Sequence, residues 1–207
     1  MGGDVGLTQV LLDHGADVKA QGKNKKTPLH IASQYGWLAL PVVRVLQEHG
    51  ADLNAQDNYG QTPLHWAKGN EVGQFLINHG ADANAMGTNG RTPLHIASEC
   101  GSAGAVRVLL EHGVDANARD ANNVTPLHLA AGSGYWRDER LDVVRLLLQY
   151  GSDTYARDDE GRTPFMIATV ERDHGMIQLL LEHEASDVPS PASSPRPSRH
   201  AKKARHS

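Results

Sequence analysis

The sequence predicts an all-α repeat solenoid, in which helix-turn-helix units with β-hairpin fingers stack side by side. Three observations support this prediction. A four-residue string recurs along the chain, a second string alternates with it, and apolar residues lie at helical spacing between the two. The 207 residues are 39% hydrophobic but only 5% aromatic, which favours many small packed units over one core of large side chains.

The two recurring strings identify the kind of repeat. The string Thr-Pro-Leu-His and one altered copy, Thr-Pro-Phe-Met, begin at Thr27, Thr62, Thr92, Thr125 and Thr163. The string His-Gly-Ala-Asp and two altered copies begin at His14, His49, His79, His112 and Tyr150. The spacings of the first string are 35, 30, 33 and 38 residues, close to the ankyrin period of about 33. Residues 7–184 therefore resemble the ankyrin repeat family.

The resemblance implies about five repeats preceded by an N-terminal half repeat. The expected segments are a partial repeat at 1–21, repeats at 22–56 and 87–119, a shortened repeat at 57–86, a repeat with an insertion at 120–157, a C-terminal repeat at 158–187, and a disordered basic Pro/Ser tail at 188–207. The unequal spacings are placed between the two helices of a repeat: two extra residues within 37–41, three missing around 68–71, and five extra within 135–140.

Each residue of the repeat has a local physical role. Threonine caps the first helix, and proline in the first turn gives up no hydrogen bond that the helix needs. Glycine ends the second helix in a left-handed conformation. Glycine also stands in each finger except where Asn123 or Lys25 replaces it; asparagine tolerates a positive φ, whereas Lys25 predicts a different first finger. The asparagines Asn54, Asn84 and Asn117 are expected to stabilise local turns.

The ends of the chain and its single cysteine, Cys100, indicate an intracellular protein, cytoplasmic or nuclear or both. The N-terminus has neither a basic start nor an apolar run, and no segment approaches the roughly 20 apolar residues that span a bilayer, so we expect no membrane contact. The half repeat cannot bury its own apolar face. It indicates an excerpt of a longer protein, a shortened gene, or an end covered by a partner.

The charge is unevenly distributed along the chain. The net charge is −4, but the tail from Ala185 carries five basic residues and one acid, so residues 1–184 carry −8. We therefore expect no nucleic-acid binding by the repeat body, because it repels phosphate. The basic segment 199–205 leaves nuclear import or nucleic-acid contact by the tail open.

The residues that could support catalysis or metal binding are better explained by the repeat. Nine of the twelve histidines stand at two framework positions, so neighbours are a whole repeat apart and do not form a zinc cluster. The ankyrin resemblance implies that the Thr-Pro-Leu-His imidazole ties adjacent repeats together. Cys100 lacks a catalytic signature, and the glycines form no phosphate-binding loop. We expect no catalytic residue, no metal and no cofactor.

The residues that the repeat pattern does not require predict where a partner binds. By resemblance, the fingertips and first helices of such a stack form an extended concave surface. The first fingertip is basic (Lys23, Lys25, Lys26) and the last acidic (Asp158, Asp159, Glu160). Tyr59 and Trp66 offer aromatic anchors between them, although packing between repeats is the favoured role of Trp66. The inserted segment Tyr135–Arg140 is a further binding candidate. The candidate partner-binding residues are Lys23, Lys26, Tyr35, Asn58, Tyr59, Gln61, Asn89, Arg91, Glu99, Asn122, Tyr135, Trp136, Asp159, Glu160 and Arg162.

The function predicted from these features is a non-catalytic protein–protein interaction module that acts as a scaffold, adaptor or regulator. It is expected to be monomeric and to bind a protein partner, whose identity the sequence leaves open, through the concave surface. Two alternatives remain. The repeats could target a larger enzyme or channel whose catalytic domain is absent here, or the chain could be a nuclear regulator that uses its basic tail.

Overall fold

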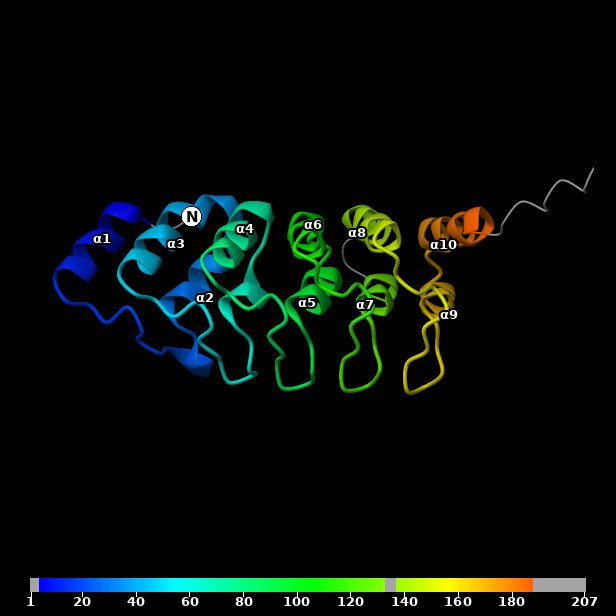
Figure 1. Ribbon diagram of the computed structural model, residues 1–207, viewed down its shortest axis with the longest axis horizontal. Coiled ribbons are helices and arrows are strands. Elements are labelled where there is room, and N and C mark those ends of the chain that lie inside the picture. The colour runs from blue at the N-terminus through cyan, green and yellow to red at the C-terminus, as the bar shows by residue number, and fades with distance from the viewer. Residues whose placement is uncertain (1–3, 133–136, 188–207) are drawn as a thin grey trace, which may run out of the picture.

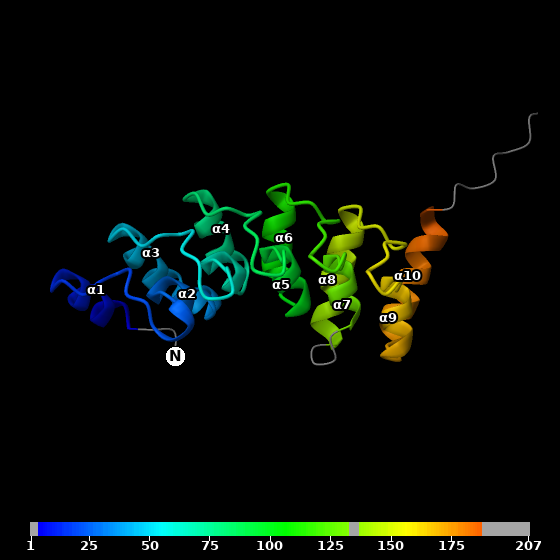
Figure 2. The same cartoon turned by 90° about the horizontal axis from the view of Figure 1, so that it is seen from below.

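The chain folds into two rows of helices, with loops projecting beside one row (Figure 1). The computed structural model describes residues 4–132 and 137–187. The outer row contains α1 (Val5–Asp13), α3 (Leu40–Glu48), α4 (Asn70–Asn78), α6 (Ala103–Glu111), α8 (Arg137–Gln149) and α10 (His174–Asp187). The inner row, next to the loops, contains α2 (Pro28–Ser33), the 3-10 turn η3 (Pro63–Trp66), α5 (Pro93–Glu99), α7 (Pro126–Gly132) and α9 (Pro164–Val170). Successive members of each row pack side by side, with α1 and α10 at opposite ends (Figure 2).

One continuous apolar core runs along the stack between the two rows. Each of the four inner elements with an intact string contributes its leucine, which is at most 3% exposed: Leu29, Leu64, Leu94 and Leu127. The outer helices contribute fully buried valines: Val43, Val72, Val106 and Val143. Burying a side chain of this size stabilises the fold by about 1.5–3 kcal/mol. The helical solenoid predicted from the sequence is confirmed.

Every intact Thr-Pro-Leu-His string begins an inner helix with the same local bonds. The backbone N–H of Thr27 donates to Nδ1 of His30 at 3.1 Å, and the Thr27 hydroxyl lies 2.8 Å from the same atom. Equivalent pairs join Thr62 to His65, Thr92 to His95 and Thr125 to His128. A backbone N–H can only donate, so Nδ1 is an acceptor and the neutral imidazole carries its hydrogen on Nε2.

That Nε2 hydrogen ties each repeat to the next one. The Nε2 nitrogen lies 3.0–3.1 Å from a carbonyl oxygen of the following finger, to which it donates; the pairs are His30–Gln61, His65–Arg91, His95–Val124 and His128–Arg162. The tie that the ankyrin resemblance implied is therefore confirmed. In the fifth copy Met166 replaces the histidine, and Thr163 caps the helix through its hydroxyl alone.

The helix-ending glycines and their histidines also behave as the pattern predicted. Gly50, Gly80, Gly113 and Gly151 all have positive φ values, between 77° and 99°. The imidazole before each of the first three contacts the backbone carbonyl four residues earlier through Nδ1, as His49 does with Val45 at 2.8 Å. The outer row thus has its own histidine bond, which stays within one helix.

The fingers are tight turns, which differs from the β-hairpin expectation, since no strand occurs in the described part of the chain. The N–H of Asp57 donates to the carbonyl of Gln61, and the Asp57 carboxylate accepts the N–H groups of Tyr59 and Gln61. One backbone bond then links each finger to its neighbour, as from Thr88 to Tyr59 at 2.8 Å. Single bonds of this kind hold the fingers in register without a ladder of strand pairs.

The first finger differs from the others, as its lysine predicted. Residues Lys23–Lys25 form the short 3-10 turn η1, in which Asn24 and Lys25 have φ values of 60° and 57°. The fourth finger keeps the usual geometry because Asn123 adopts φ 57°, a conformation that asparagine tolerates.

The irregular spacings lie between helices, and they change the lengths of the elements there. The extra residues of the first repeat form the 3-10 turn η2 (Gly36–Ala39) ahead of α3. The missing residues of the second repeat reduce its inner helix to the four-residue η3. In the fourth repeat the described part of the insertion lengthens α8 to 13 residues, against nine in α3, α4 and α6.

Two of the asparagines act between repeats, which corrects the expectation of a purely local role. The Asn54 amide donates to the carbonyl of Gly80 and accepts the N–H of Asp82. Asn117 bonds Gly151 and Asp153 in the same way. Each side chain therefore fixes the helix end of the following repeat.

The buried inner-row imidazoles should make stability depend on pH. Burial lowers the pKa of His30, His65, His95 and His128, and their contacts with backbone carbonyls offset only part of that effect. The unfolded chain then binds protons first, near pH 6.5, so stability is complete above about pH 6.5 and falls as the solution is acidified below it. Urea unfolding followed across this range should show the loss.

Two variants should separate the contributions to this pH dependence. His95→Gln removes one titrating group and should reduce the slope by up to about 1.4 kcal/mol per pH unit. The half-buried His49 has a raised pKa, owing first to its contact with the Val45 carbonyl and then to Asp13, so it favours folding at low pH. His49→Gln should therefore steepen the loss. A slope that His95→Gln leaves unchanged would contradict the assignment.

Candidate functional site

The predicted binding residues that the structure describes lie on the finger face, which we define as the surface formed by the inner helices, the residues directly after them and the fingers (residues 22–26, 57–61, 87–91, 120–124 and 158–162). Tyr59 at the second fingertip and Tyr35 after α2 are both about half exposed, at 53% and 50%. The exposed polar members are Lys23, Asn58, Asn89, Asn122, Asp159 and Glu160. The finger face thus presents two exposed aromatic side chains above a row of short polar ones.

Three candidates have a structural role as well as a position on this face. Gln61, Arg91 and Arg162 supply the carbonyl groups that the histidines of the preceding repeats contact. The Arg91 guanidinium also pairs with Glu99 at 2.9 Å and with Asp120 at 3.3 Å. Its side chain therefore holds two neighbouring repeats together.

The acidic character expected of the last finger is weaker than the sequence indicated. Asp158 is only 7% exposed, and its carboxylate accepts the N–H groups of Glu160 and Arg162. Burial opposes ionisation of Asp158, but the N–H and guanidinium of Arg162 prevail and lower its pKa. Asp158 is therefore a turn-forming residue like Asp57 and Asp120, and not a binding residue of the fingertip.

The other two acids of this finger are also engaged. Asp159 accepts a hydrogen bond from the Asn123 amide at 2.7 Å, and Glu160 pairs with Arg162 at 2.9 Å. The lysines of the first finger have no carboxylate within 4 Å in the described part of the chain. The expected charge gradient thus becomes a basic end next to a largely compensated remainder.

The inserted segment of the fourth repeat is placed only in part. Tyr135 and Trp136 lie outside the described residues, as does the tail at 188–207. Arg140 is 2% exposed, which corrects its expected place in an exposed binding element. It donates to the Ala130 carbonyl at 3.1 Å and lies 3.5 Å from the Asp173 carboxylate. Arg140 therefore joins the fourth repeat to the fifth.

Two hollows open on the finger face. The larger, about 390 Å³, lies over the third to fifth repeats and is walled by the ion-paired residues Arg91, Glu99, Asp158 and Arg162. The smaller, about 150 Å³, lies over η3 and is lined by Gln34, His65, Trp66, Ala67, Lys68, Ile96, Ala97, Cys100 and Ser102. The larger hollow is polar and internally compensated, whereas the smaller one has an aromatic and aliphatic lining.

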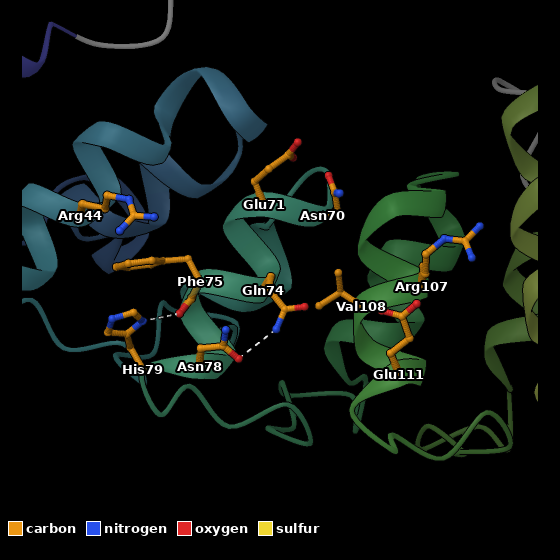
Figure 3. Close-up of a pocket in the computed structure, with 10 residues that line it drawn as sticks. All are labelled: Arg44, Asn70, Glu71, Gln74, Phe75, Asn78, His79, Arg107, Val108 and Glu111. Atoms are coloured by element: carbon orange, nitrogen blue, oxygen red, sulfur yellow. Dashed lines mark hydrogen bonds between the residues drawn. The ribbon is translucent and has the colours of Figure 1, made fainter.

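A third hollow lies on the outer row, between α4 and α6, and its walls bond to one another (Figure 3). The Phe75 ring stacks on His79 at 4.0 Å, with the Arg44 guanidinium 4.9 Å from the ring centroid. Gln74 donates to Asn78 at 2.9 Å and contacts Nε2 of His112 at 3.0 Å. These contacts join successive outer helices.

The described residues contain no cluster of three or more His, Cys, Asp or Glu placed to hold a metal ion. Burial, and secondly the charge of Glu99, raise the pKa of the Cys100 thiol. A raised pKa keeps the thiol protonated, the opposite of what a nucleophilic cysteine requires. Within the described ranges, no helix has the length and apolar character needed to cross a membrane.

Two features match a known family: the two rows of helices, and the bond from each histidine Nε2 to the next finger, which we call the tether. The family model for ankyrin repeats (3 copies) matches residues 1–87, 68–158 and 120–192. The chain belongs to the ankyrin repeat family. No curated protein matches it. Ankyrin repeats are generally protein-interaction modules, typically without catalytic activity.

The hollow over η3 is the part of the site that residue patterns alone missed. Lys68 was not among the candidate binding residues, and Trp66 was assigned to packing. The available signal was the three-residue deletion at this point, which shortened the inner helix. Which of the candidates contacts a partner stays a prediction.

Removing the Arg140 charge should loosen the fifth repeat. Arg140→Ala removes the guanidinium beside the buried Asp173 carboxylate. We expect this change to lower the free energy of unfolding by about 3–5 kcal/mol. Hydrogen exchange should then accelerate most in α9 and α10, because a repeat contacts only its neighbours.

A double variant provides the control for this prediction. Arg140→Met with Asp173→Asn removes both charges and keeps an oxygen to cap the N–H of Met176, which Asp173 accepts at 3.1 Å. Its loss of stability should be clearly smaller. Equal losses in the two variants would show that the charge pair is not what joins the repeats.

Proposed function

We propose that this chain is a non-catalytic protein-binding module that holds a protein partner on its finger face. The observation that supports this most directly is the separation of roles along each repeat. The threonine, leucine and histidine of each intact Thr-Pro-Leu-His string are buried, whereas Tyr35, Tyr59 and the finger asparagines are exposed and differ from repeat to repeat. The constant residues build the frame, and the variable ones are available to a partner.

The finger face is held in place before any partner arrives. Backbone bonds between fingers and imidazole bonds between repeats fix its shape. Binding to a preformed surface loses less conformational entropy than binding that must first order a loop. Exposed tyrosines on such a surface are the residue type enriched in binding hot spots. We therefore place the centre of the partner site near Tyr59.

Affinity capture with matched variants tests this proposal. Tyr59→Ala should weaken a captured partner about tenfold or more, because a hot-spot aromatic contributes at least that much. Tyr155→Ala is the control, since Tyr155 is 68% exposed and lies between α8 and the last finger, outside the finger face. Circular dichroism should show both variants equally folded. Partners that bind the Tyr59 variant and the wild-type chain equally would contradict the proposal.

A further inference from the structure

The shortened second repeat leaves an unfilled space on the finger face. The inner helices on either side, α2 and α5, have six and seven residues, whereas η3 has four and leads through Ala67–Gly69 directly into α4. Both neighbours pack against η3. A hollow of about 150 Å³ lies where η3 ends, lined by Trp66, Ala67 and Lys68 together with residues of the neighbouring repeats. We call it the η3 hollow.

The lining of the η3 hollow is suited to one apolar side chain. Trp66, Ile96 and the methyl groups of Ala67 and Ala97 supply apolar surface, and Cys100 stands at its edge at the end of α5. An apolar cavity of about this volume accommodates a group the size of benzene. The Trp66 indole N–H is buried and finds no acceptor among the described residues, although a buried indole usually has one.

The surroundings of the η3 hollow are basic. Lys68 lines it and is exposed, and the Lys26 ammonium lies 3.2 Å from the centroid of the Trp66 ring. Neither lysine has a carboxylate within 4 Å in the described part of the chain. The nearby Glu99 is already paired with Arg91 at 2.9 Å. Lys23 and Lys25 in the first finger extend this positive charge.

We propose that the η3 hollow binds one apolar side chain of an acidic peptide segment in a protein partner, with the segment's carboxylates against Lys26 and Lys68. This deepens the proposed function and rests on it. The charge of the site selects the occupant, because complementary charge steers association and like charge disfavours it. The basic tail of this same chain carries five basic residues against one acid, so it has the wrong charge to fill the hollow.

A synthetic peptide with matched controls is the direct probe. Fluorescein-labelled Asp-Glu-Leu-Glu-Asp should bind in a fluorescence anisotropy titration. The same peptide with Gly in place of Leu, or with Lys in place of its acids, should bind at least about tenfold more weakly, since one loses the anchor and the other the charge match. Equal binding of the Leu and Gly peptides would overturn the proposal, and so would no binding at all.

The single cysteine reports occupancy of the η3 hollow. Cys100 is the only cysteine in the chain and is exposed, so iodoacetamide should modify it, although slowly, because the raised pKa of the thiol leaves only a small fraction as thiolate even in alkaline solution. Saturating Leu peptide should slow this modification several-fold, and the Gly peptide should not. Unchanged reactivity with the Leu peptide bound would place the peptide elsewhere and overturn the proposal.

Variants at Cys100 and Lys68 complete the test. Cys100→Phe fills the hollow and should weaken the Leu peptide at least about tenfold, while Cys100→Ala leaves it open and should bind within about twofold of wild type. Lys68→Glu should weaken binding and reduce its dependence on salt, because one attractive charge becomes repulsive. Equal affinity of the Phe and Ala variants would overturn the proposal.

The outcomes separate this inference from the proposed function. If captured partners depend on Tyr59 but tolerate Cys100→Phe, the finger face binds partners and the η3 hollow does not. If captured partners ignore both Tyr59→Ala and Cys100→Phe, the proposed function itself fails. Self-association measured by sedimentation, lost in Cys100→Phe, would make a second copy the occupant and overturn the assignment to a partner peptide.

Discussion

The neutral imidazole of the Thr-Pro-Leu-His string is the constraint on which the other features of this stack depend. Its Nδ1 holds the start of its own inner helix, and its Nε2 holds a carbonyl of the next finger. A protonated ring would lose the first bond, because both nitrogens would then be donors. One buried side chain per repeat thus sets both the local helix start and the position of the following repeat. This explains why the string survives intact four times while the spacing around it varies from 30 to 38 residues.

Because the tether runs from the start of an inner helix to the next finger, variation in length is confined to the segment between the inner and outer helices. The three irregular repeats each use that segment differently. The first adds the turn η2, the fourth adds residues at the start of α8, and the second removes residues after η3. Residues added between the two helices of a repeat can form new contacts, as Arg140 does with Asp173 in the next repeat. A deletion cannot be compensated in the same way, since its neighbours are held at a fixed distance by their own tethers, and so it leaves a hollow.

Features that recur in every repeat could be predicted from the sequence. Contacts that occur at a single interface between two repeats could not. The helix starts, the stop glycines, the unusual first finger and the left-handed Asn123 follow from local chemistry, which a periodic string displays directly. Asp158 was misplaced although its turn bonds are local and recur at Asp57 and Asp120, because a run of acidic residues was interpreted as exposed. Arg140 was misplaced because its burial depends on the carboxylate of Asp173, which only the folded chain brings near. The bridging amides of Asn54 and Asn117 were underrated for the same reason, and the η3 hollow is a property of three neighbouring repeats together.

Because the bonds that stabilise the stack involve a fixed set of residues, the other side chains are available to recognise a partner. Every tether joins only adjacent repeats, so the free energy of the stack is approximately a sum over repeats and interfaces. Side chains outside those bonds, such as Tyr59 and Lys68, can change with little effect on the frame, and the acidic body leaves the cluster of lysines near Trp66 as a local exception in charge. The Lys26 ammonium contributes to the stack through its contact with the Trp66 ring, whereas Lys68 lines the same hollow and is exposed. An acidic partner segment, as we propose, would compensate both lysines without altering the bonds between repeats.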